Sequence, residues 1–215
     1  DRYKYMLIVT SDEAKARKMC DDASFFNKEA IYYPAKDAIF YSADVHGNQI
    51  TGERLRCISR IINHSSTGEG VLTVVTTMDG IADRLIPVER FKEAVITLDY
   101  SSEIEPEKLA KKLVAMGFVR TGMVEDKGQF AIRGGIIDIF SYTDEAPVRI
   151  ELWDTEVDSI RMFDVESQRS IERLQSYSIF PATEYIFTED ELKNGLYNIK
   201  AVSYTHLRAH ETRHD

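Results

Sequence analysis

Residues 130–170 decide the fold of this chain, and they read FAIRGGIIDIFSYTDEAPVRIELWDTEVDSIRMFDVESQRS. The Gly-Gly pair at 134–135 is a turn signal, because glycine adopts positive backbone angles without a steric penalty. In the apolar run that follows, Ile137 and Ile139 share one face, and Asp138 lies on the other. This period of two predicts an antiparallel sheet of about three or four short strands with one wet face.

The rest of the stretch continues the alternation. Val148, Ile150 and Leu152 alternate with charged residues, and residues 157–163 form another strand-like run in which Arg161 faces outward. No metal-ligand cluster, nucleophile or phosphate-binding loop is visible here. We therefore interpret the stretch as a surface that binds a partner.

Residues 1–101 are predicted to form an α/β domain with a parallel sheet covered on both faces, because strands alternate with helices. Thr10 and Glu13 fit a capping box for the first helix. The expected strands are 5–9, 31–33, 39–41, 71–76 and 95–98, and the expected helices are 11–26, 51–63 and 81–86.

Residues 102–176 are predicted to form a second, inserted domain. Pro106 suits the first turn of a helix, and Gly117 suits its end. A strand carrying Arg120 and a strand at 129–133 precede the Gly-Gly turn. Residues 177–200 are expected to return to the first domain and to begin another helix.

The order of motifs resembles a known family. RGGIIDIF at 133–140, PVRIELWDTEVDSIRMFDVESQRSI at 147–171 and IFPATE at 179–184 resemble the UvrB-like N-terminal module of bacterial transcription-repair coupling factors. They are similar, more distantly, to UvrB itself, and FDVESQRS at 163–170 favours the coupling factors. The resemblance implies an α/β, parallel-sheet, helicase-like domain of the degenerate P-loop NTPase type, with an inserted and mainly antiparallel α+β domain.

The same resemblance implies a non-catalytic adaptor in nucleotide-excision repair that recruits UvrA to stalled RNA polymerase. The matching docking positions are Arg120, Phe130 and Arg133, and Ala131 stands where UvrB has a further arginine. Arginine suits such contacts because its planar fork binds carboxylates through two hydrogen bonds. RNA polymerase, DNA, ATP and Mg are expected to bind other parts of a longer parent, which resembles an ATP-hydrolysing DNA translocase.

The alternative is a fragment of a UvrB-type protein that loads onto damaged DNA with the help of ATP. The phosphate-loop pattern G-x-x-x-x-G-K-[S/T] does not occur, and residues 40–50 leave no room for the tyrosine-rich hairpin of UvrB. We therefore expect this fragment to need no cofactor. A phosphate loop upstream of Asp1 would favour the alternative.

Composition agrees with a soluble, intracellular protein, and the resemblance implies the bacterial cytoplasm. No apolar run approaches the roughly 18–20 residues of a membrane helix, and no signal peptide is seen. Cys20 and Cys57 are expected to be buried. The net charge of −9 suits a protein partner with a basic face better than nucleic acid.

Residues 201–215 depart from the family and are expected to be a non-native tail, similar to translated adapter sequence. His206, His210 and His214 would share one helix face, so a zinc-binding enzyme is a further rival. We expect no metal site there.

Overall fold

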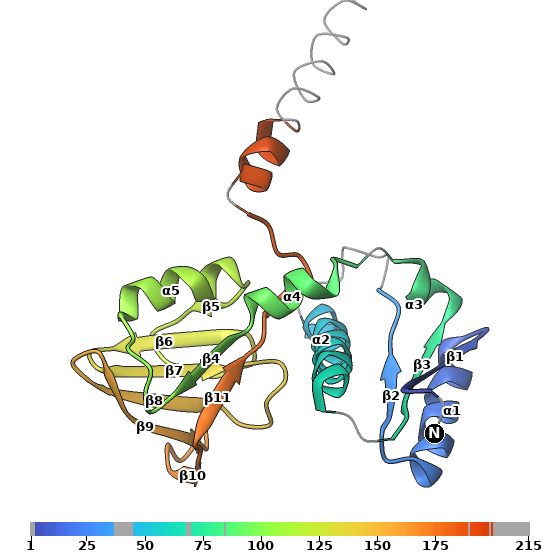
Figure 1. The fold of residues 1–215 in the computed structure, drawn as a ribbon, viewed down its shortest axis with the longest axis horizontal. Helices are drawn as coiled ribbons and strands as arrows, with labels where there is room; N and C mark the ends of the chain where they lie inside the picture. Colours follow the sequence, from blue (N-terminus) through green and yellow to red (C-terminus); the bar gives the residue numbers. More distant parts are fainter. Residues whose placement is uncertain are drawn as a thin grey trace, which may run out of the picture. The chain divides into compact units, whose positions relative to one another are not determined.

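The structure is a computed structural model that describes residues 3–36, 45–67, 70–83, 85–188, 190–197 and 199. The chain divides into two compact units, residues 1–184 and residues 185–215. Every helix and strand labelled in Figure 1 belongs to the first unit. None of the described helices combines the length and the apolarity that crossing a membrane requires.

A three-stranded parallel sheet with the order β1-β3-β2 forms the first part of this unit. Its strands are β1 (Tyr5–Thr10), β2 (Ala30–Tyr33) and β3 (Leu72–Thr77). Helices α1 (Glu13–Phe26) and α2 (Val45–Thr67) cover its opposite faces (Figure 1). The predicted parallel sheet with two covered faces is therefore confirmed for these strands, whereas its helicase-like character stays a prediction.

The two cysteines lie in the two interfaces of this sheet. Cys20 of α1 packs with Ala16 and Val75, and Cys57 of α2 packs with Ile31 and Leu72. Both thiols are free and buried, as predicted. Burial raises the pKa of Cys57 to about 12, so its thiol stays protonated at neutral pH.

The cap of the first helix and the helix bounds after β3 differ from the predictions. The cap of α1 is Asp12 rather than Thr10, because the Asp12 carboxylate accepts a hydrogen bond from the Lys15 N–H at 2.9 Å. The helix predicted at 81–86 is wrong in its bounds, because α3 (Met78–Ala82) ends early in that span and α4 (Val88–Ala94) begins only after Pro87. The strand predicted at 39–41 lies outside the described residues.

The strand predicted at 95–98 exists as β4 (Ile96–Asp99), but its assignment to the parallel sheet is wrong. It pairs with β11 (Ser176–Ile179) in an antiparallel, two-stranded sheet. The reason is packing, because Leu98 and Ile179 join the core of the antiparallel part.

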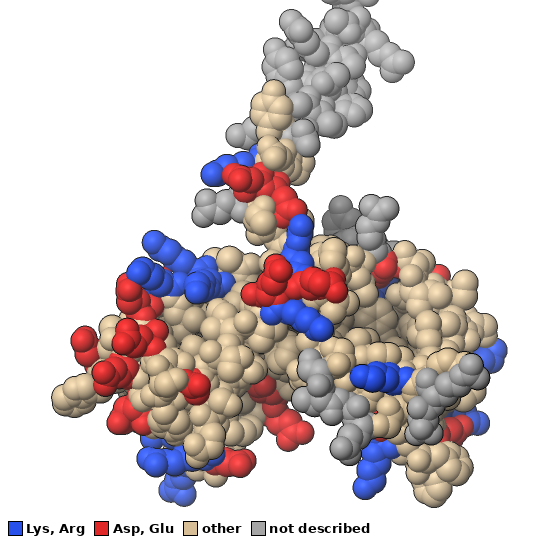
Figure 2. Space-filling model, viewed as in Figure 1, with Lys and Arg blue, Asp and Glu red and all other residues tan. Residues whose placement is uncertain are grey.

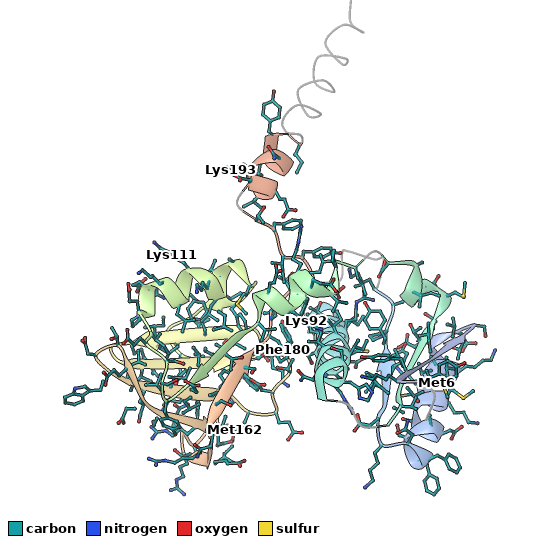
Figure 3. The ribbon with its side chains drawn as sticks, viewed as in Figure 1. Met6, Lys92, Lys111, Met162, Phe180 and Lys193 are labelled. Carbon is teal, nitrogen blue, oxygen red and sulfur yellow. The ribbon has the colours of Figure 1, made fainter. Side chains whose placement is uncertain are left out.

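A six-stranded sheet with the order β10-β9-β8-β7-β6-β5 forms that antiparallel part, in which only the β5–β6 pair is parallel. Helix α5 (Pro106–Ala115) covers one face of it, and Lys111 points away from the sheet (Figures 1 and 3). The strands are β5 (Val119–Arg120), β6 (Gln129–Arg133), β7 (Ile136–Phe140), β8 (Val148–Trp153), β9 (Glu156–Phe163) and β10 (Ser170–Arg173).

The core of this sheet lies on the α5 side. Ile137 and Ile139 of β7 are fully buried there, together with Ile150 and Ile160 of the neighbouring strands. Burying each such side chain contributes roughly 1.5–3 kcal/mol. The predicted wet face is the opposite side of the same strands, but it is only partly exposed, because Ala131 and Phe140 are buried there in a second apolar cluster with Val124.

The second unit begins with a capped helix. Thr188 Oγ1 accepts a hydrogen bond from the Glu191 N–H at 3.2 Å, and the Glu191 carboxylate accepts one from the Thr188 N–H at 2.9 Å. This reciprocal pair is a capping box, and residues 190–197 are helical as predicted. The predicted tail at 201–215, with its three histidines, lies outside the described residues.

Candidate docking face of the antiparallel sheet

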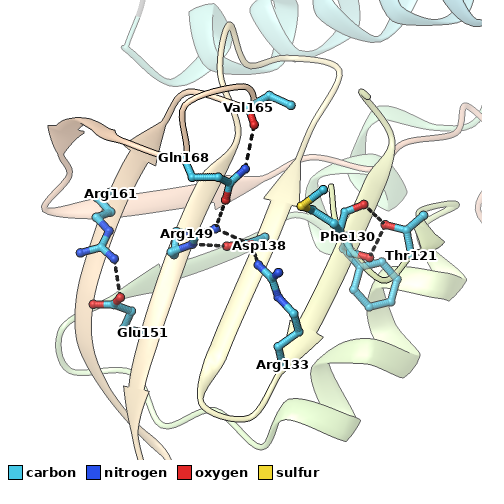
Figure 4. A network of polar contacts seen from close by, with 10 residues as sticks. Thr121, Phe130, Arg133, Asp138, Arg149, Glu151, Arg161, Val165 and Gln168 are labelled. Atoms are coloured by element: carbon cyan, nitrogen blue, oxygen red, sulfur yellow. Dashed lines mark hydrogen bonds and ion pairs between the residues drawn. The ribbon is translucent and has the colours of Figure 1, made fainter. Parts of the chain in front are cut away.

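The side of the six-stranded sheet that turns away from α5 carries a network of charged residues (Figure 4). Directly paired residues on neighbouring strands point to the same side of a sheet. Asp138 pairs with Arg149, and Arg149 pairs with Arg161, so these three form one row across β7, β8 and β9. We call this side the polar face and define it by its ion-pairing residues Arg133, Asp138, Arg149, Glu151 and Arg161.

Asp138 is the centre of the polar face. Its side chain is only 1% exposed, yet two guanidinium groups hold it. Arg149 donates from Nε at 2.6 Å and from Nη2 at 2.9 Å, and Arg133 donates from Nη2 at 2.7 Å. A buried carboxylate needs such partners, and its hydrogen bond in turn raises the pKa of Arg149.

Arg149 is itself held from two further directions. Its Cζ lies 4.3 Å from the centroid of the Phe163 ring, which is a cation–π distance. Its Nη2 donates to Gln168 Oε1 at 2.8 Å. Gln168 has a φ of +57° and donates to the Val165 carbonyl at 2.8 Å, which fixes the loop after β9 against the polar face.

A second ion pair, Arg161 with Glu151, extends the network toward β9, and Ser159 Oγ donates to Glu151 Oε2 at 2.8 Å. The five defining residues of the polar face comprise three arginines and two carboxylates. These five residues therefore carry a net charge of +1, although the whole chain carries −9. Such a surface favours an acidic patch on a partner.

The three residues predicted to bind a partner have different surroundings. The side chains of Arg120 and Arg133 are each 45% exposed. Phe130 is 0% exposed and belongs to the core beneath α5. The prediction that Phe130 contacts a partner directly is therefore wrong, because its ring has no free surface.

Arg120 and Arg133 do not lie on the same face of the sheet. Arg120 is paired with Phe130 and therefore points to the α5 side, where Glu107 binds it at 3.1 Å. Arg133 follows Phe130 by three residues, so alternation turns it to the polar face. The two arginines can meet one partner only around the edge formed by β5.

The sequence did not reveal that Asp138 holds Arg133 in place and is itself bound by Arg149. An acid inside the apolar run 136–140 and a basic residue at Arg149 were visible, and a buried acid in a strand predicts a buried partner. The strand register that joins them was not available from the sequence. Within the described part of the chain, no cluster of three His, Cys, Asp or Glu side chains could hold a metal.

Comparison with known proteins adds the family. Residues 96–185 match the family model described as the UvrB interaction domain, and this segment runs from β4 through β11. Over 190 residues the chain is 40% identical to the transcription-repair-coupling factor of Bacillus subtilis (strain 168). The matched region covers 87% of this chain and 16% of that relative. The chain is a relative of the transcription-repair coupling factors.

The similarity extends to other relatives. The coupling factors of Staphylococcus haemolyticus (strain JCSC1435) and Staphylococcus aureus (strain Mu50 / ATCC 700699) are both 36% identical, over 193 and 191 residues. The matches cover 89% and 88% of this chain and 16% of each relative. The chain thus spans about a sixth of the length of these coupling factors, and the predicted resemblance to their UvrB-like module is confirmed.

Proposed function

We propose that the chain is a non-catalytic docking module that binds UvrA, and that Arg133 on the polar face is its central contact. The observation that carries this proposal is the exposed guanidinium of Arg133, held by the buried carboxylate of Asp138 inside the segment that matches the UvrB interaction domain. Within a full-length coupling factor the module would bring UvrA to a stalled RNA polymerase.

The surroundings of Arg133 suit it to recognise a carboxylate. Among the described residues Asp138 is its only hydrogen-bond partner, and it uses one Nη2 donor. An arginine has five N–H donors, so most of the planar fork is available to an acidic group on UvrA. Because Asp138 already restricts the side chain, binding loses less rotamer entropy than it would with a free arginine.

Arg120 would contribute from the other side of the same edge. Strand β5 is two residues long and ends the sheet, so a partner that wraps around it can reach both faces. The pair of Arg120 with Glu107 is exposed and therefore weak, and it can be exchanged for a carboxylate of the partner at small cost.

Substitution of the two arginines tests the proposal. We expect Arg133→Ala and Arg120→Glu each to weaken UvrA binding about 30-fold or more, because each loses a charge-assisted contact worth roughly 2 kcal/mol. Arg133→Glu is unsuitable, because it would place a second carboxylate beside Asp138 and destabilise the fold. The measurement is a calorimetric titration with purified UvrA beside a thermal melt.

The matched control is Arg17→Ala, which removes an equally exposed, ion-paired arginine from α1. It should leave UvrA binding unchanged. Wild-type affinity in both folded test variants would show that the docking face has been placed wrongly.

A further inference from the structure

Trp153 is the only tryptophan of the chain, and it is 80% exposed. Tryptophan is usually well buried, because it carries the largest apolar surface of any side chain. When it stands in the open, it marks the centre of an interface more often than other residues do.

The backbone around Trp153 is fixed on both sides. Trp153 pairs with Glu156 across a two-residue turn in which Asp154 has a φ of +58°. The Leu152 N–H donates to the Gly135 carbonyl, and the Thr155 carbonyl accepts from the Ile104 N–H, both at 2.7 Å. A partner that takes up the indole therefore does not have to order the hairpin first, which favours affinity.

Alternation places Trp153 on the polar face. The register of β8 and β9 shifts between Glu151 and Leu152, but Leu152 still packs against the core and pairs with buried Val157, so Trp153 points the other way. Glu151 pairs with Ile136, and Ile136 pairs with Arg133. Trp153 thus stands two residues beyond the row of Arg133, at the same end of the sheet.

Acidic residues surround the indole. Asp154 and Glu156 flank it in the hairpin and are exposed, and Glu103 is joined to Glu156 by a backbone bridge. Figure 2 shows acidic side chains gathered over the end of the β8–β9 hairpin. A cation that approaches this indole would gain from the ring face and from the carboxylates together.

We propose that Trp153 is the aromatic anchor of the docking face, and that UvrA receives its indole in an apolar pocket whose rim carries lysine or arginine. This inference rests on the proposed function. The docking face would then have two contact points, Arg133 for an acidic group of UvrA and Trp153 for a basic one.

Because the chain has one tryptophan, labelling with 5-fluorotryptophan gives one 19F resonance that reports this position alone. We expect that resonance to shift when UvrA is added. Its chemical shift should then no longer differ between H₂O and D₂O, because the indole is no longer exposed to solvent. In titration calorimetry, Trp153→Ala should weaken binding about tenfold or more, with an unchanged melting temperature because the side chain is exposed.

The control is Phe26→Ala, which removes an 88% exposed aromatic from α1 and should leave affinity unchanged. If UvrA binds while the fluorine resonance and the affinity of Trp153→Ala stay as in the wild type, the anchor is overturned and the docking function stands. If the wild-type chain does not bind UvrA at all, both are overturned.

Discussion

At the scale of single residues, Asp138 shows how one buried charge can organise a surface. It stands in an apolar strand where alternation turns it from the core to the polar face. Arg149 and Arg133 neutralise it, and only Arg133 remains substantially exposed. The buried carboxylate therefore binds one arginine that is mostly buried, Arg149, and one that is accessible to a partner, Arg133.

Replacing Asp138 tests this division. Asp138→Ala leaves Arg149, whose side chain is 12% exposed, without its carboxylate. We expect a loss of about 3 kcal/mol in the free energy of unfolding. Removing one partner of a buried ion pair leaves the other charge buried without compensation, which is more unfavourable than replacing both partners by apolar residues. Urea denaturation measures it. Glu107→Ala, which breaks the exposed pair with Arg120, should change stability by less than about 0.5 kcal/mol. Equal losses in both variants would contradict the assignment.

At the scale of elements, Tyr142 joins α2 to the turn before β6. A Cβ added to Gly52 of α2 would lie 2.9 Å from Tyr142 Cδ1, and one added to Gly128 would lie 2.9 Å from its Cε2. Gly128 also has a φ of +81°, which disfavours other residues. Both glycines thus make room for one ring, and the ring holds two elements together.

A double-mutant cycle can show whether Gly52 is required by that ring. Alanine favours a helix over glycine by roughly 1 kcal/mol, whereas overpacking costs about 1–3 kcal/mol. We expect Gly52→Ala to destabilise the wild-type chain but to stabilise a Tyr142→Ala background by about 1 kcal/mol. Chemical denaturation of the four proteins gives both values. A stabilising Gly52→Ala in the wild type would mean that Tyr142 does not occupy this space.

Strands in which apolar residues alternate over several positions could be predicted from the sequence. Short edge strands, and the pairing of strands far apart in the chain, could not. Strands β6 to β9 were expected within a residue or two because their core face repeats every second residue. The edge strand β10 is exposed along its whole length and gives no such period. β4 was recognised as a strand, but its partner β11 lies some 80 residues further along the chain, and no local signal specifies that pairing. The same limit concealed that Arg120 and Arg133 face opposite sides.

At the scale of the whole first unit, one ion pair joins residues that are far apart in sequence. Arg54 of α2 is fully buried, and it binds Glu184 through Nε at 2.6 Å and Nη2 at 3.0 Å. Its Nη1 donates to the Pro34 carbonyl at 2.7 Å, and its Cζ lies 4.3 Å from the centroid of the Tyr33 ring. Since Glu184 follows β11 and ends the first unit, the pair ties the end of the antiparallel part to the α/β part.

We therefore expect Glu184→Ala to be among the most destabilising single substitutions in the chain. It would leave a fully buried guanidinium with only the longer ion pair to Asp83 at 3.4 Å, at a loss of about 3–5 kcal/mol, when a domain has only about 5–15 kcal/mol of stability. Arg54→Leu combined with Glu184→Leu should recover much of that loss, because an apolar pair needs no compensation and the remaining partners, Lys36 and Asp83, are partly exposed to water. Urea unfolding of the single and double variants measures both effects, with Glu13→Ala in the exposed pair with Arg17 as the control. A small loss in Glu184→Ala would mean that water or Asp83 compensates the charge of Arg54, whereas a double variant less stable than the single one would show that the ion pair itself stabilises the unit.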